Sequence, residues 1–165
     1  MKTITLTRLE TWNPCYDHDT LKAIRGRKAR WSALDILALD DIPARDRLWA
    51  VLHEELIDAP MLHEFACRCA EQALAMVEAP DPRSVAAIAA KRAWLRGEIS
   101  DEQLDAASRD AASAASSAAS SAASMAAEMA AEMAAASAAS WSAAALDAAR
   151  DVQVVMLVEM LEGGG

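Results

Sequence analysis

The clearest pattern along the chain is an alternation of small apolar and small polar residues between Ala106 and Ala149, a stretch that is more than three-quarters Ala and Ser. Ala has the highest helix propensity of any residue, and no Pro or Gly interrupts the chain between Gly97 and Gly163. The pattern therefore predicts helix, although low complexity often indicates disorder.

Placed on a helix at about 100° per residue, this stretch has two different sides. One side carries Ser113, Ser116, Ser117, Ser120, Ser121, Ser124, Glu128 and Glu132. The other carries Ala115, Ala118, Ala122, Ala126, Met129 and Met133. We expect the Ser and Glu side to face water. A surface of Ala lets a second helix approach closely, so the other side predicts tight helix packing.

The Ala-rich segment is too long to form one helix in a chain of this size. From Ser100 to Glu162 a single helix would extend for about 90 Å, and the remaining residues are too few to cover both of its faces. We therefore expect at least one break. Because Ser side chains compete for backbone hydrogen bonds, the candidate positions are Ser116-Ser117, Ser120-Ser121 and the region from Ser137 to Ser142.

Upstream of this segment, Pro and Gly divide the chain into shorter helices. Apolar residues at helical spacing predict helices over Ser32–Leu39, from Pro43, from Pro60 to about Val77, and from Pro82 to Gly97. Asp81 is suited to cap the last of these, with Pro82 in its first turn. Gly97 is suited to end it. Ser100 and Gln103 form a capping box before the Ala-rich segment.

The N-terminal residues give a weaker signal. Ile4 to Leu9 alternate in polarity, which fits a short strand, an extended arm or a first helical turn, and no second strand is evident in the sequence. Asn13-Pro14 interrupts the pattern, and Pro14 can open a helix. Lys22 to Arg30 is strongly basic and contains Gly26, so we expect an exposed loop there.

Together these elements predict one all-α domain, a helical bundle held together by tightly packed Ala-rich helices. Its parts are an N-terminal arm and basic segment (1–31), short helices (32–97), the Ala-rich helices (98–162) and a short tail (163–165). We expect the core to include the bulky residues Trp49, Phe65, Trp94, Trp141 and Leu146.

Charge and composition narrow the classes of function. The chain of 165 residues has a net charge of −9, which argues against direct binding of nucleic acid. No apolar run reaches the length of a membrane span, and the N-terminus lacks the apolar core of a signal peptide. Three Cys residues in no disulfide pattern fit a reducing compartment, so we expect a cytoplasmic protein without membrane contact.

Few residues form a pattern that carries chemistry. Cys15 and His18, and His63 and Cys67, are spaced so that each pair could share a helix face, and together they are weak candidates for a metal site. Cys and His residues at such spacing are more commonly buried thiols and surface imidazoles that bind no metal. Because the sequence contains no nucleophile elbow and no Gly-rich phosphate loop, we predict no catalytic residues, no cofactor and no enzymatic activity.

The acidic residues are the remaining candidates for a functional surface. The candidates for an interaction surface are Glu54, Glu55, Asp58, Glu64, Glu128 and Glu132. Carboxylates in such numbers also fit a mimic of nucleic acid that occupies a DNA-binding protein. Exposed Ala faces leave open a homo-oligomer.

Several sequence stretches resemble known proteins. The stretches LDILALDDIPARDRLWAVL and DPRSVAAIAAKRAWLRGEISDEQLDAA, with the Ala tract, are similar to Ala-rich helical proteins of bacteria and phages. From about Leu62 onward the chain resembles the putative immunity proteins of polymorphic toxin systems. The resemblance implies an all-α fold and a non-enzymatic protein that binds and blocks a protein effector, in immunity or in phage counter-defence. The alternatives are the acidic nucleic-acid mimic and a metal- or small-ligand-binding enzyme.

Overall fold

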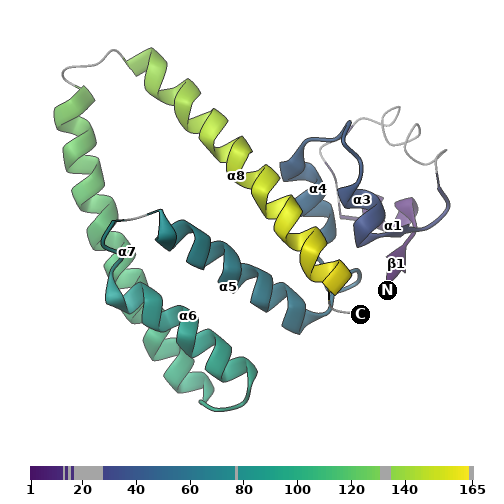
Figure 1. Ribbon diagram of the computed structural model, residues 1–165, viewed down its shortest axis with the longest axis horizontal. Coiled ribbons are helices and arrows are strands. Elements are labelled where there is room, and N and C mark those ends of the chain that lie inside the picture. The colour runs from purple at the N-terminus through teal and green to yellow at the C-terminus, as the bar shows by residue number, and fades with distance from the viewer. Residues whose placement is uncertain (13, 15, 17–27, 77, 131–134, 164–165) are drawn as a thin grey trace. The chain divides into compact units, whose positions relative to one another are not determined.

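The computed structural model describes residues 1–12, 14, 16, 28–76, 78–130 and 135–163, with side chains described outside residues 118–145. Its elements are almost all helices, which confirms the predicted all-α class (Figure 1). The chain forms two compact units. The first combines Met1–Leu62 with Ala145–Gly165, and the second comprises His63–Ala144.

The first unit begins with a strand and a short helix. Strand β1 (Thr3–Ile4) pairs antiparallel with strand β2 (Trp31–Ser32), with Ile4 opposite Trp31. Helix α1 (Leu6–Glu10) follows at once, with Thr5 accepting a hydrogen bond at its N-terminus. The alternating pattern thus contains both a strand and a helical turn. The expectation that this strand has no partner is wrong, because its partner is a two-residue segment too short to produce a pattern.

Two further helices complete the N-terminal part of this unit. Helix α3 (Ala33–Leu37) starts at a capping box in which Ser32 and Asp35 satisfy each other's backbone N–H groups. Helix α4 (Ala44–Val51) follows Pro43 and packs against α3. The Arg47 guanidinium donates to the Leu37 carbonyl at 2.6 Å and so ties the two helices together.

The last part of the chain supplies the rest of this unit. Helix α8 (Ala135–Gly163) enters it at Ala145, and its Val154 and Leu157 are buried. Other buried residues of the unit are Ile4, Leu6, Leu9, Trp31, Ile36, Leu37, Leu48, Val51, Leu56 and Ile57. The two ends of the chain therefore share one small hydrophobic core.

The second unit contains most of helix α5 (Ala59–Ala75), helix α6 (Pro82–Leu95) and helix α7 (Asp101–Ala130). Helices α6 and α7 lie side by side as a hairpin (Figure 1). The predicted caps are confirmed at the start of α6, where Asp81 accepts from the backbone N–H of Arg83, and at the start of α7, where Ser100 and Gln103 bond each other's backbone.

Gly97 ends α6 in the predicted way. Its φ of 72° lies in the left-handed region, which glycine adopts without a steric penalty. The N–H of Gly97 donates to the Trp94 carbonyl and that of Glu98 to the Ala93 carbonyl, both at 2.9 Å. These two bonds complete a Schellman motif and satisfy carbonyls that the helix end leaves open.

The predicted division of the Ala-rich segment is confirmed, but the predicted positions are wrong. Helix α7 runs through Ser116-Ser117 and Ser120-Ser121 and ends at Ala130, and α8 begins at Ala135 and runs through Ser137–Ser142. The hydroxyl of Ser117 donates to the Ser113 carbonyl one turn earlier, at 3.0 Å. This bond adds to the helix rather than replacing its backbone bonds, so Ser pairs do not break it.

The outward and inward sides of α7 are rotated slightly from their predicted positions. Ser113, Ser116 and Ser117 are exposed, as predicted. Ala114 is buried, whereas Ala115, predicted to face inward, is exposed. The side chains from Ala118 to Met133 that complete the predicted faces lie outside the described residues.

The predicted core is partly wrong. Phe65 is buried as expected, and Trp94 is only partly buried. Trp49 is 41% exposed and Leu146 is 56% exposed, since α4 buries Leu48 and Val51 and α8 buries Val154 and Leu157 instead. Trp141 lies outside the described side chains.

Candidate functional site

Two of the predicted acidic residues at the junction of α4 and α5, Glu55 and Asp58, are paired with cations from the N-terminal part of the chain. Lys2 donates to the backbone carbonyl of Glu54 at 2.7 Å and pairs with the Asp58 carboxylate at 2.6 Å. Arg8 binds both carboxylate oxygens of Glu55, and this hydrogen bonding lowers the pKa of Glu55. These carboxylates are therefore held in place within the first unit, although Glu55 and Asp58 stay exposed.

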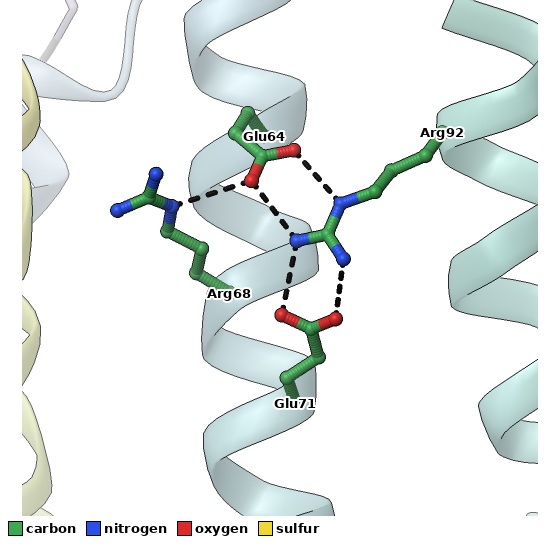
Figure 2. A network of polar contacts seen from close by, with 4 residues as sticks. All are labelled: Glu64, Arg68, Glu71 and Arg92. Carbon is green, nitrogen blue, oxygen red and sulfur yellow. Dashed lines mark hydrogen bonds and ion pairs between the residues drawn. The ribbon is translucent and has the colours of Figure 1, made fainter.

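Glu64 belongs to a separate network in the second unit. Figure 2 shows Glu64, Arg68 and Glu71 on α5, with the Arg92 side chain of α6 reaching between the two carboxylates. The three α5 residues fall at positions i, i+4 and i+7, which place them on one face of a helix. The sequence spacing therefore builds an acid–base–acid row that an Arg from the neighbouring helix can complete.

The contacts of Arg92 have the geometry of strong ion pairs. Its Nε and one terminal nitrogen donate to the two oxygens of Glu64 at 3.0 and 2.9 Å. Its terminal nitrogens also donate to both oxygens of Glu71, one of them at 2.9 Å. Arg68 donates to Glu64 at 3.2 Å. Two-pronged Arg–carboxylate pairs fix orientation as well as charge.

This network favours the charged forms of Glu64, Glu71 and Arg92. Hydrogen bonding from Arg92 lowers the pKa of Glu64 and of Glu71, and the two carboxylates raise the pKa of Arg92. Two cations and two anions balance each other, and all four side chains remain accessible to water. The network can therefore present oriented donors and acceptors to a partner without a large net charge.

An aromatic group lies on the same pair of helices. The Trp94 indole donates to Asp101 at 2.7 Å, and the Lys91 ammonium lies 3.9 Å from the Trp94 ring centroid. The His63 ring meets Trp94 edge-on at 5.9 Å between centroids. Trp and Arg are the residue types that most often dominate binding at protein interfaces. We call the surface formed by His63, Glu64, Arg68, Glu71, Lys91, Arg92 and Trp94 the α5–α6 surface.

The weak metal candidates are not assembled in the described part of the chain. His63 contacts Trp94, and Cys67 is buried one turn along α5, where burial raises the pKa of its thiol. Cys15 and His18 lie outside the described residues. No group of three potential metal ligands occurs among the residues that the structure describes.

Two of the predicted surface carboxylates also fall outside the described part. They are the side chain of Glu128 and the whole of Glu132. Sequence reasoning missed Glu71 and Arg92, which complete the network around Glu64. The spacing of Glu64, Arg68 and Glu71 was visible in the sequence, and it could have identified the acid–base–acid row. Only the position of the Arg92 side chain of α6 beside the α5 carboxylates reveals it as their partner.

Comparison with protein families gives a match that covers this surface. Residues 55–151 match the model of the family described as Imm-5 like putative immunity protein, and this range contains the whole second unit. Comparison with curated proteins gives no match, and comparison with solved structures gives none either. Among the described helices, none is long and apolar enough to cross a membrane. Since the matched segment spans more than half of its length, the chain belongs to the Imm-5 like putative immunity protein family.

Proposed function

We propose that this protein binds a protein toxin and blocks it without catalysing a reaction. The observation that carries the proposal is the family match over residues 55–151. An immunity-type protein has a toxin as its partner, and binding alone is sufficient to neutralise one. The identity of the toxin and the residues that contact it are the parts that need an experiment.

The α5–α6 surface is the place where we expect the toxin to bind. It lies wholly within the matched segment, and its Arg92 and Trp94 are of the types that act as anchors in interfaces. Its carboxylates alternate with Arg residues, an arrangement that suits a protein surface of mixed charge. This alternation does not favour a mimic of nucleic acid, which needs unbroken rows of carboxylates.

The test uses the proteins encoded beside this gene in its native genome. Each is expressed in a bacterial host with and without the full-length chain, and growth is measured. For any protein that is toxic alone and tolerated with the chain, the dissociation constant of the purified pair is measured by calorimetry. We expect at least one such pair, bound directly.

A matched pair of variants then tests the surface. Arg68→Glu reverses an exposed charge within it, and Arg109→Glu makes the same change on the exposed face of α7. We expect Arg68→Glu to weaken toxin binding about tenfold or more, which is about 1.4 kcal/mol, and Arg109→Glu to change it less than about twofold. Failure of every neighbouring protein to bind would contradict the proposed function. Equal binding by the two variants would contradict only the location.

A further inference from the structure

A groove in the first unit is lined by the C-terminal part of α8 and by residues of α3, of α4 and of the segment that joins α3 to α4. It consists of two hollows that share Asp151, one of about 320 Å³ and one of about 420 Å³. The α8 side chains that line it are Asp147, Asp151, Val154, Val155, Val158 and Glu159. The opposite side is lined by Leu37, Asp40, Pro43, Ala44, Arg45 and Arg47.

The groove has an apolar base that its own chain leaves partly uncovered. Of its apolar lining residues, Leu37 and Val154 are buried, whereas Val155 is 58% exposed. Val158 is half-buried. An aliphatic side chain that lines a hollow and remains in water gains free energy when another apolar group covers it.

The charged groups around this base are mainly acidic. Asp40, Asp147, Asp151 and Glu159 supply four carboxylates, against two guanidinium groups. Arg47 is 11% exposed and donates a hydrogen bond to the Leu37 carbonyl. Its guanidinium therefore joins α3 to α4 and is little accessible to a partner. Arg45 pairs with the neighbouring Asp46 at 3.3 Å.

The carboxylates, in contrast, reach water. The side chain of Asp40 is 96% exposed, and that of Asp147 is 70% exposed although it pairs with Arg150. Because no three potential metal ligands come together among the described residues, these carboxylates are not arranged for a metal ion. Their spread along the groove fits an extended cationic partner instead.

We propose that this groove binds a cationic amphipathic helix of a protein partner. On α8, Asp147, Asp151, Val155 and Glu159 recur every four residues along about 18 Å of helix. A partner helix with Lys or Arg at three- and four-residue intervals can face these carboxylates while its aliphatic side chains cover Val155. Helix-in-groove binding of this kind is a recurring mode of recognition.

This inference rests on the proposed function in one respect, that the partner is the toxin. Most of the lining residues lie outside the family match of 55–151, and only Asp147 and Asp151 lie within it. The groove is therefore largely a feature of this chain's flanking segments. It is a second surface, separate from the α5–α6 surface, and it suits a cationic helix rather than a protein surface of mixed charge.

The test uses the full-length protein and a fluorescein-labelled helical peptide of about 18 residues built from Leu and Lys. Its affinity is measured by fluorescence anisotropy for the wild type and for two double variants. Asp147→Asn with Asp151→Asn removes two groove charges, and Asp105→Asn with Asp110→Asn removes two exposed charges from α7. We expect the groove variant to bind about tenfold or more weakly, and the α7 variant to differ from the wild type by less than about twofold.

Two further measurements decide between occupants. Val155→Ser should also weaken peptide binding several-fold, because it removes apolar surface without changing charge. Light scattering after gel filtration reports whether the wild type is a dimer that Val155→Glu converts to monomers. A dimer of that kind would overturn the proposal by making a second copy the occupant.

Equal weakening by the two double variants would also overturn it, since binding would then follow overall acidity. So would failure of the wild type to bind the peptide. The assay contains no toxin, so its failure leaves the growth-protection experiment unaffected. Failure of growth protection likewise leaves the peptide result standing.

Discussion

Replacement of Leu157 by Ala tests the central feature of the first unit, a core shared by the two ends of the chain. Leu157 lies near the end of α8 and is fully buried. Leu→Ala substitutions at such sites cost about 2–5 kcal/mol, because transfer free energy is lost and a cavity is left behind. We expect about 3 kcal/mol here, since a unit with one small core has few other residues that can move to fill the space.

That loss is large compared with the stability of a domain, which is about 5–15 kcal/mol. It corresponds to a fall in Tm of roughly 12–24 °C for a unit of this size. The measurements are thermal unfolding by circular dichroism and urea unfolding by Trp fluorescence, to which Trp31, buried in the same unit, contributes with the four other Trp residues of the chain. The urea slope should remain unchanged, so that the shift in midpoint reports stability alone.

The matched control is Val155→Ala, two residues away on the same helix. Val155 is exposed, so its replacement should change the free energy of unfolding by no more than about 0.5 kcal/mol. If Leu157→Ala destabilised the protein no more than Val155→Ala, the C-terminal helix would not belong to this core. The assignment of both chain ends to one unit would then be refuted.

Two other predictions concern local structure and pH. Gly97→Ala should cost about 1 kcal/mol, because an L-residue is strained at a φ of 72°, and an unchanged Tm would contradict this; Gly163→Ala, with open space around it and no positive φ, is the control. Hydrogen bonds from Lys28 and Ser32 lower the pKa of Asp35 from 3.8 to about 2. After allowance for solvent screening, this shift contributes about 1 kcal/mol to the free energy of unfolding. Because the pKa is lowered in the folded state, that contribution is complete above about pH 4 and is lost as the pH falls toward 2. Urea unfolding between pH 6 and pH 2 should show a smaller acid-induced loss in Asp35→Asn than in the wild type, and equal losses would contradict the assignment.

The features that the sequence predicted correctly depend on a few neighbouring residues. Asp81 before Pro82 caps α6, and Gly97 ends it, because both effects arise within one helical turn. The Ser100 capping box is of the same kind. The helical state of the Ala-rich segment follows from propensity summed over many residues. Local chemistry was sufficient for each of them.

The features that the sequence could not predict join distant residues. Lys2 meets Asp58, and Arg8 meets Glu55, across about fifty positions of the chain. The sequence predicts those carboxylates as part of an interaction surface, because no Lys or Arg lies near them in the chain. Trp49 is a similar case, since its position in an apolar stripe suggested burial. The packing of α4 against α3 buries Leu48 and Val51 and leaves Trp49 41% exposed.

The family match follows the division of the chain into two units. The second unit, His63–Ala144, lies entirely within the matched segment, and most of the first unit lies outside it. The second unit is therefore inserted in sequence between the two parts of the first unit, and most of those two parts lie outside the matched segment. If toxin binding uses the α5–α6 surface and the groove uses the flanks, the two surfaces can change independently. Variation in the groove would then alter which toxin is preferred, whereas variation at Arg92 would weaken binding of every toxin.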